Sequence, residues 1–363
     1  MEFLHFTRDI PVKYRADIAV IGGGPAGVAA ALTAARARAR VFAADAAGCF
    51  GGMGTSGLIP AFMQFSDGER FLAGGVGEEI FAALGGVKQG KCGLSIDAER
   101  LKRVYDGLMA HPNITASFFT TLSAVEADNG QIRHAVFTAK SGLFAVEAAV
   151  FLDCTGDGDL CAYAGASYEM GEVMASTLCS AWAGIDWDRV RGSDDRFIRE
   201  AVEAGVISQV DYHLPGMWRT GERTGGGNIG HVFGVDGTDE RSLTAAMIEG
   251  RRRVLEYEKY YKEYLTGYEE MTLTATAPVL GVRESRRILG DYMLNLEDFQ
   301  NRAVFADEIG RYAYPVDIHA GSATADAYES YKDRFGSGRG DGRGQAVEQD
   351  RRGRKHYFNR GVI

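Results

Sequence analysis

The chain has 363 residues, of which 45% are hydrophobic and 25% charged, and its formal net charge is −9 at pH 7. This length suits one large α/β domain or two interleaved domains with a sizeable core. The acidic balance offers no basic face for nucleic acid, and no apolar run approaches the about 18 residues that a membrane span needs. Residues 1–15 lack the apolar core of a secretory signal, so we expect a cytoplasmic protein.

The cysteines argue against several kinds of site. Their number is odd and no two of them form a C-x-x-C pair, which argues against a disulfide framework, a zinc site and a self-contained iron–sulfur cluster. No metal is therefore predicted. The five cysteines are Cys49, Cys92, Cys154, Cys161 and Cys179, of which Cys154 and Cys161 are expected to be small buried residues.

In chain order, the first predicted unit is a dinucleotide-binding βαβ unit over residues 17–45. An apolar strand leads into Gly22, Gly24 and Gly27, and an alanine-rich helix and a second strand ending at Asp45 follow. The glycines allow a tight turn, approach of the backbone to a pyrophosphate, and close packing of the helix on the sheet. The helix N-terminus favours the anion, and Asp45 is placed to bind a ribose and to disfavour the 2′-phosphate of NADP. An ordinary glycine turn is the alternative.

A glycine-rich loop over residues 48–57 comes next, and its backbone N–H groups could meet an anion or a flat ring; a flexible loop is the alternative. Helical spacing predicts helices over residues 76–84 and 97–110, the second with Asp97 as its N-cap. Residues 114–153 alternate β-rich runs with turns, as in an antiparallel meander. The last run, 149–153, is an apolar strand that delivers C-T-G-D-G-D at 154–159 to the ligand crevice of an open α/β sheet.

These motifs, in this order, resemble the FAD-dependent oxidoreductases of the glutathione-reductase-like flavoprotein superfamily. More narrowly, the chain is similar to a bacterial FAD-dependent oxidoreductase family related to the flavin core of the heterodisulfide reductase flavin subunit. The narrower likeness rests on G-G-M-G-T-S-G at 51–57, C-T-G-D-G-D-L-C-A-Y-A-G-A at 154–166, G-V-R-E-S-R-R-I-L-G-D-Y at 281–292 and Y-P-V-D-I-H at 314–319. It covers residues 17–319 and implies FAD rather than NAD.

The resemblance also implies which residues bind the cofactor. In that superfamily the pyrophosphate lies on the first helix, the adenosine ribose on the acid, the following loop near the flavin end, and the strand-end T-G-D-G at the middle of FAD. These roles fall on Gly22, Gly24, Pro25, Ala26, Gly27, Asp45, Gly51, Gly52, Met53, Thr155, Gly156 and Asp157.

Residues 166–330 are expected to form an α+β substrate domain that covers the flavin. It contains a hydrophilic helix over 242–265, an apolar stretch over 271–282 and a tyrosine-rich run over 257–268 that predicts a packing face. Its densest charge cluster holds Arg283, Arg286 and Arg287 with Glu284. Arg283 could hold a carboxylate, or negative charge that develops during hydride transfer, and an internal Arg–Glu network is the alternative.

Two histidines in this part, His231 and His319, are candidates for proton transfer, because histidine is the side chain best suited to exchange a proton at neutral pH. A structural role is the alternative for each. Asp236 and Asp317 could orient such a histidine.

The C-terminal segment, residues 331–363, departs from the family pattern. It is rich in Gly and Arg, with nine Lys or Arg against four Asp or Glu, and we predict a disordered tail. The resemblance implies that family members return there to the FAD domain with a proline-containing strand, an A-G-R turn and a final helix facing the flavin. A truncated gene, a shifted reading frame or divergence would each account for the difference.

Together these features predict an α/β protein: a Rossmann-like FAD-binding domain with a parallel sheet and a β-meander, into which an α+β substrate domain is inserted. The expected boundaries are 15–165 with a helical excursion over 60–112, then 166–330, then the tail. The expected activity is hydride transfer between FAD and a small, anionic organic substrate, with an electron-transfer partner as a further expectation. A degenerate flavoprotein-like chain without catalysis and an NAD-dependent dehydrogenase are the alternatives.

Overall fold

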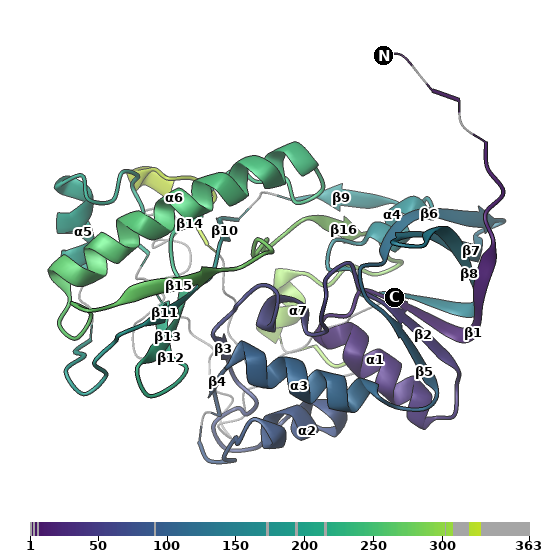
Figure 1. The fold of residues 1–363 in the computed structure, drawn as a ribbon, viewed down its shortest axis with the longest axis horizontal. Coiled ribbons are helices and arrows are strands. Elements are labelled where there is room, and N and C mark those ends of the chain that lie inside the picture. Colours follow the sequence, from purple (N-terminus) through teal and green to yellow (C-terminus); the bar gives the residue numbers. More distant parts are fainter. Residues whose placement is uncertain are drawn as a thin grey trace. The chain divides into compact units, whose positions relative to one another are not determined.

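The computed structural model describes residues 2, 4–5, 7–90, 92–171, 174–192, 195–213, 216–301, 303–307 and 319–327 (Figure 1). The predicted tail over 331–363, and all of the Y-P-V-D-I-H segment except His319, lie outside these residues. The chain divides into two compact units, each discontinuous in sequence. The first contains Met1–Gly52 and Lys102–Tyr168, and the second contains Met53–Leu101 and the described residues from Glu169 onward.

The first unit is built on a six-stranded sheet in the order β5-β2-β1-β8-β7-β6. The first four strands are parallel, whereas β7 and β6 are antiparallel to their neighbours. The strands are β5 (Ile114–Ser117), β2 (Val41–Ala44), β1 (Val12–Ile21), β8 (Gly142–Asp153), β7 (Gln131–Ala139) and β6 (Thr121–Asp128). The predicted fold class, a mixed α/β protein with a parallel sheet, is confirmed.

The central strand β1 shows how the sequence sets burial. Its first residues alternate between apolar and charged side chains, whereas its last three residues, Ala19, Val20 and Ile21, are all buried. Helix α1 (Pro25–Arg36) follows, and its face with Val28, Ala31 and Leu32 is buried. Small residues on this helix allow close approach to the sheet. The core of the first unit consists of Ala19, Ile21, Phe42, Ala44, Leu122, Ala135, Phe137, Phe144, Val146 and Leu160.

Two details of the predicted meander were wrong. The run at 114–117 is β5, which pairs in parallel with β2 and therefore belongs to the other side of the sheet. Residues 149–153 are not a separate strand but the end of β8, a strand of 12 residues. One long strand thus pairs in parallel with β1 and antiparallel with β7. Alternation along a strand reports which side chains are buried, but it does not report which strand lies alongside.

The second unit contains a four-stranded antiparallel sheet in the order β12-β13-β11-β15 and three two-stranded pairs, of which β9 begins one residue before the unit. The sheet strands are β12 (Gly216–Arg219), β13 (Thr224–Asn228), β11 (Ser180–Ala183) and β15 (Thr272–Thr276). The pairs are β10 (Ser176–Thr177) with β14 (His231–Val232), β3 (Ala61–Phe62) with β4 (Leu94–Ser95), and β9 (Tyr168–Met170) with β16 (Arg286–Ile288).

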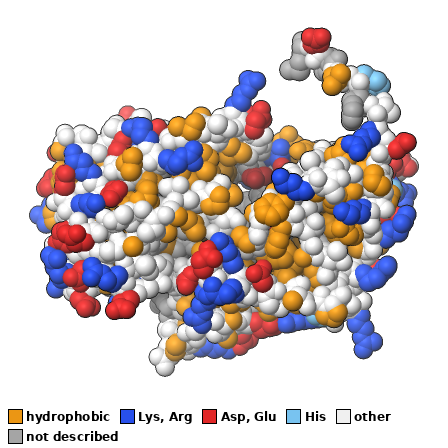
Figure 2. Space-filling model, viewed as in Figure 1, with side chains coloured by type: hydrophobic (Ala, Val, Ile, Leu, Met, Phe, Trp, Pro, Cys, Tyr) orange, Lys and Arg blue, Asp and Glu red, His pale blue; other side chains and the backbone are white. Residues whose placement is uncertain are grey.

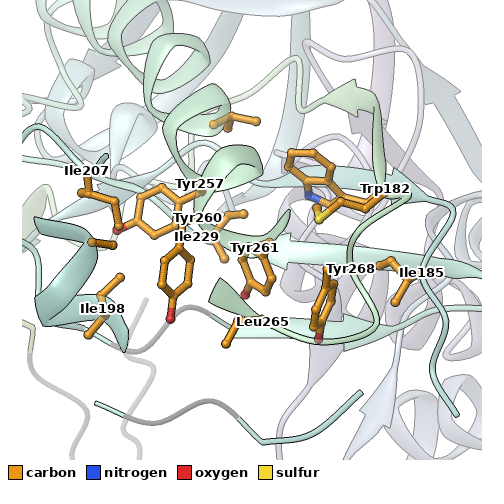
Figure 3. Close-up of a cluster of buried hydrophobic side chains, with 13 residues drawn as sticks. Trp182, Ile185, Ile198, Ile207, Ile229, Tyr257, Tyr260, Tyr261, Leu265 and Tyr268 are labelled. Carbon is orange, nitrogen blue, oxygen red and sulfur yellow. The ribbon is translucent and has the colours of Figure 1, made fainter. Parts of the chain in front are cut away.

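The longest helix, α6 (Glu240–Tyr264), carries the core of this unit. Asp239 caps it by accepting a hydrogen bond from the backbone N–H of Arg241. Tyr257, Tyr260 and Tyr261 are each at most 2% exposed, so the tyrosine-rich run is the packing face that its spacing predicts. Figure 3 shows these rings gathered with Trp182 and with branched aliphatic side chains from neighbouring elements.

The remaining helices are α2 (Gly75–Ala83), α3 (Ala98–Met109), α4 (Asp159–Tyr163), α5 (Asp195–Glu203) and α7 (Leu296–Asn301). Of these, α2 and α3 match the helices predicted over 76–84 and 97–110 to within one residue at each end, whereas α4, α5 and α7 were not predicted. Asp97 is the N-cap of α3, as predicted, because its Oδ1 accepts hydrogen bonds from the backbone N–H groups of Glu99 and Arg100.

Acidic and basic side chains intermingle on the face drawn in Figure 2, with apolar side chains exposed between them. The acidic excess of the chain is therefore not gathered into one patch on this face. None of the helices in the described part of the chain is long and apolar enough to cross a membrane.

Candidate functional site

The glycine turn after β1 is built as tightly as its sequence suggests. Gly22 has φ of +99°, and a Cβ on it would lie 2.2 Å from the carbonyl oxygen of Cys154. A Cβ on Gly27 would lie 1.9 Å from the carbonyl oxygen of Gly22. Any side chain at either position would therefore push apart the turn, the helix and the end of β8.

Gly24 is different, because no protein atom lies within 4 Å of where its Cβ would be. Gly24 is also the N-cap of α1, which starts at Pro25 and has no side-chain cap. Pro25 and Ala26 are exposed. The helix thus presents backbone N–H groups and the positive end of its dipole to open space, an arrangement that suits a phosphate.

Asp45 follows β2 and reaches the glycine turn. Its Oδ2 accepts a hydrogen bond of 2.6 Å from the N–H of Gly23, and its Oδ1 accepts one of 2.7 Å from the N–H of Ala47. These bonds fix the half-buried carboxylate in one orientation. Each carboxylate oxygen can accept more than one hydrogen bond, so the group retains capacity for a hydroxyl-bearing ligand.

The loop after Asp45 packs on the same turn. The N–H of Gly51 donates to the carbonyl of Gly23 at 2.8 Å, and a Cβ on Gly52 would lie 3.1 Å from the Cα of Gly24. Both glycines have positive φ, which favours glycine. The next residue, Met53, belongs to the second unit, where a Cβ on Gly281 would lie 3.2 Å from its terminal methyl carbon.

The polar end of β8 lies beside the glycine turn, because Ile21 pairs with Asp153 and the N–H of Cys154 donates to the carbonyl of Ile21. The hydroxyl of Thr155 is held by two hydrogen bonds at the end of β8. It donates to the carboxylate of Asp153 at 2.7 Å and accepts from the backbone N–H of Asp159 at 3.0 Å. Gly156, with φ of +91°, is exposed and has open space around it.

Asp153 is a residue that the sequence reasoning missed. Its buried carboxylate also accepts from the N–H of Cys161, so it holds the strand end and the start of α4 together. Burial, with the nearby negative charge of Asp153, raises the pKa of both the Cys154 and the Cys161 thiols to about 11. Neither cysteine is fully buried, contrary to expectation; both are half-buried at this corner.

In the second unit, the arginine cluster does not act as a single group. Arg287 is exposed and pairs with Glu284 at 3.0 Å and, more distantly, with Glu169 at 3.8 Å. Arg286 lies near Asp236, whose pKa is lowered mainly by its hydrogen bonds with Thr238 and further by the charge of Arg286. Arg287 thus takes part in Arg–Glu ion pairs at the surface, the kind of contact that the alternative interpretation of the cluster expects.

Arg283 is half-buried, and its Nε donates to the backbone carbonyl of Ala175 at 3.0 Å. That carbonyl belongs to residues 174–177, which also contact the histidines. Thr177 pairs with His231 across β10 and β14, and the N–H of His319 lies 3.5 Å from the sulfur of Met174. Thr177 further exchanges two backbone hydrogen bonds with Gly281. Arg283, His231 and His319 are therefore brought together around one segment.

A third histidine, His213, completes this cluster and was not foreseen. Its ring centroid lies 5.1 Å from that of His231 and 4.7 Å from that of His319. The three rings come from positions far apart in the sequence, so no local spacing could have revealed them. Only the dipeptide Tyr212-His213 after an acid, Asp211, offered a signal.

Asp211 orients the cluster. It is 1% exposed, and its carboxylate lies 3.2 Å from Nδ1 of His231. It also accepts from the Tyr257 hydroxyl at 2.9 Å and from the N–H of His213 at 3.2 Å. Asp236 and Asp317 were the two acids considered for this role, and the carboxylate of Asp236 accepts hydrogen bonds from Thr238 instead. Asp317 lies outside the described residues.

A family model described as FAD dependent oxidoreductase matches residues 17–337 of this chain. The chain belongs to the FAD-dependent oxidoreductase family. The cofactor of this family is FAD, so the choice between FAD and NAD, which the residues alone left open, falls on FAD. The narrower relation to glutathione reductase or to heterodisulfide reductase is not part of this finding.

A search of curated proteins finds no significant match. Among solved structures, the chain is similar to a geranylgeranyl bacteriochlorophyll reductase-like protein from Thermoplasma acidophilum, with 14% identity and a TM-score of 0.49 over 74% of this chain and 66% of that one. It is also similar to p-nitrophenol 4-monooxygenase from Pseudomonas putida, with 12% identity and a TM-score of 0.44 over 77% and 70%. A third similar structure is glycine oxidase from Geobacillus kaustophilus, with 12% identity and a TM-score of 0.43 over 75% of this chain and 83% of that one. The chain spans just under two thirds of the first of these proteins. Likenesses this weak carry no argument about substrate.

Proposed function

We propose that the ends of β1, β2 and β8 in the first unit hold FAD. The support is the cradle at Gly24, where an uncapped helix N-terminus faces space that a side chain would fill. Asp45 has remaining capacity to accept ribose hydroxyls, and Gly51 and Gly52 close on the same turn. The proposed FAD-binding residues are Gly22, Gly24, Pro25, Ala26, Gly27, Asp45, Gly51, Gly52, Met53, Thr155, Gly156 and Asp157.

We further propose that the reaction is hydride transfer between FAD and a small, anionic organic substrate bound by the second unit. Bound FAD supplies the two-electron acceptor or donor. The observation that carries this proposal is the gathering of Arg283, His231 and His319 around residues 174–177. A cation and proton-exchanging groups in one place suit a substrate that carries a negative charge and loses both a hydride and a proton.

Arg283 is proposed to bind the carboxylate of the substrate. Its bond from Nε to the Ala175 carbonyl fixes the plane of the guanidinium. A planar group with fixed N–H directions matches a carboxylate in a way that the compact ammonium of lysine does not.

The histidines are proposed to take the proton. When the C–H bond of a substrate alcohol or amine breaks with hydride leaving, the O–H or N–H proton must be accepted by a base. Asp211 holds the ring of His231 through Nδ1, which leaves Nε2 as the atom that can exchange a proton.

The test compares Arg283→Lys with Arg287→Lys, a matched change four positions along the chain. The flavoprotein is mixed anaerobically with a panel of hydroxy, amino and other organic carboxylates, and loss of the oxidised flavin absorbance is followed. For a substrate that reduces the wild type, Arg283→Lys is expected to lower the reduction rate at fixed substrate by about 10- to 100-fold, the scale of a lost charged hydrogen bond of about 1.5–3 kcal/mol. Arg287→Lys should keep the wild-type rate.

Equal rates in the two variants, with FAD content intact, would remove Arg283 from the substrate site. A stoichiometric flavoprotein that no carboxylate reduces would contradict the anionic substrate. The acceptor that re-oxidises the flavin is proposed to be a separate electron-transfer partner; rapid re-oxidation by dioxygen alone would argue against this.

A further inference from the structure

The three histidine rings of the second unit form a compact donor set. His213, His231 and His319 each offer a ring nitrogen, and these nitrogens lie within 4.8 Å of one another. Within the described part of the chain, these three histidines are the group of His, Cys, Asp or Glu side chains whose potential ligand atoms lie close enough together to share one metal ion. His231 is 6% exposed and His319 is 9% exposed, so the nitrogens meet in a largely dry environment.

We propose that these three histidines bind one divalent first-row transition metal ion, with Zn²⁺ as the representative. Neutral imidazole is a common ligand for Zn, Cu, Fe and Ni, and three histidines with one open position form a known catalytic donor set for zinc. The sequence analysis argued against a zinc site only from the number and spacing of the cysteines. Cysteine spacing cannot reveal a site made of three histidines that lie far apart in the sequence.

The surroundings of His231 support this assignment independently. A histidine that binds a metal through one ring nitrogen usually donates its other N–H to a carboxylate, which fixes the tautomer and the ring orientation. Asp211 is that carboxylate: it lies 3.2 Å from Nδ1 of His231, and it is 1% exposed. Tyr257 and two backbone N–H groups hold Asp211 in turn.

The distances between the ring nitrogens are also compatible with one shared metal ion. Zn–N bonds are about 2.0–2.1 Å long, so nitrogens within 4.8 Å of one another need to move inward by less than about 1 Å to share one ion. Rotation of the imidazole rings can supply such movements. The backbone of His231 is fixed by pairing with β10, and the N–H of His213 is fixed by Asp211.

The metal-binding proposal does not depend on the proposed reaction. If a metal is bound, however, the histidines would have a different task in that reaction. An imidazole nitrogen that binds a cation no longer exchanges a proton, so this task would pass to a water molecule on the cation. The binding experiment is therefore done without substrate, and its result is separate from the test of Arg283.

The experiment uses the full chain without an affinity tag, with its FAD in place, after removal of metals by a chelator. The protein is dialysed against Zn²⁺ at about micromolar concentration, and bound zinc per chain is measured by mass spectrometry of the elements. One zinc per chain is expected for the wild type. His213→Ala is expected to bind at least about 100-fold more weakly, whereas His134→Ala, which changes a histidine paired with Glu126 outside the cluster, should keep full binding.

Asp211→Asn tests the supporting carboxylate and should weaken zinc binding by about 10- to 100-fold, the usual effect of removing such a partner. Melting temperature and FAD content without zinc show whether each variant is folded. Zinc should raise the melting temperature of the wild type but not that of His213→Ala. A wild-type protein that retains no zinc overturns the proposal whatever the variants do, and so does equal binding by wild type and His213→Ala.

Discussion

At the scale of single residues, the glycines of the first turn differ in what surrounds them. Gly27 is closed in by the carbonyl of Gly22 at 1.9 Å from the position of a Cβ, whereas Gly24 faces open space. A glycine that protein atoms surround serves the fold. A glycine beside a space that no protein atom fills leaves room for a ligand, so the two positions should respond differently to the same substitution.

We predict that Gly24→Val folds with a melting temperature close to that of the wild type but no longer retains FAD, because the side chain occupies the space left for the pyrophosphate. Gly27→Val should instead destabilise the protein by at least about 1–3 kcal/mol through overpacking. Thermal unfolding and the ratio of flavin to protein after desalting measure both effects. Retention of FAD by Gly24→Val would show that the pyrophosphate lies elsewhere.

The thiols at the end of β8 give a second residue-scale prediction. The pKa values of Cys154 and Cys161 are raised from 9.0 to about 11 by burial and by Asp153. An acid whose pKa is raised stays protonated to higher pH, so at pH 8 the reactive thiolate should be about 100-fold rarer in the folded chain than in the unfolded one. Alkylation followed by mass spectrometry should show correspondingly slow labelling of these two cysteines, and normal labelling in denaturant. Fast labelling of the folded protein would contradict their placement.

At the scale of elements, α6 depends on its first turn and on its tyrosine face. Asp239 satisfies a backbone N–H that would otherwise have no partner within the helix. The helix is long and its opposite face is charged, so packing of Tyr257, Tyr260 and Tyr261 supplies most of its stability.

We predict that Asp239→Ala lowers the free energy of unfolding by about 1 kcal/mol, whereas Asp239→Ser, which keeps a capping oxygen, costs much less. Denaturant unfolding with an unchanged m-value would measure this difference. If both variants match the wild type, the start of α6 is held by other contacts.

Structural features could be predicted from the sequence where residues close together in the chain determine them. The glycine turn, the cap at Asp97 and the tyrosine face are all fixed by residues a few positions apart, and the structure has them as expected. The partner of a strand is not local, which is why β5 was assigned to the wrong side of the sheet. The histidine cluster was incomplete for the same reason: His213 meets His231 only through the fold of the second unit.

At the scale of the whole molecule, the chain passes between the two units after Gly52, after Leu101 and after Tyr168. A family motif can be read from short segments, but this division cannot, because it depends on contacts between segments more than 50 residues apart. Each unit has its own apolar core. A ligand of the first unit should therefore stabilise mainly the backbone of that unit.

Hydrogen exchange tests this expectation. We predict that FAD slows exchange at the amides of residues 22–28 and 153–158, where the glycine turn and the end of β8 meet, and leaves the tyrosine face of α6 nearly unchanged. Comparison of the FAD-loaded protein with protein stripped of FAD gives both measurements. Equal protection of α6 would show that the two cores unfold as one cooperative unit.

The order of strands in the first unit also has a consequence during translation. β1 lies between β2 and β8, and β2 is made soon after it, whereas β8 begins at residue 142. At about 5–20 residues per second, β1 waits about 6–24 s on the ribosome for its second neighbour. During that interval the nascent chain exposes one unpaired, apolar strand edge, which is the kind of surface that chaperones bind and that aggregates form on. The yield of folded enzyme should accordingly depend on translation speed and on chaperone supply.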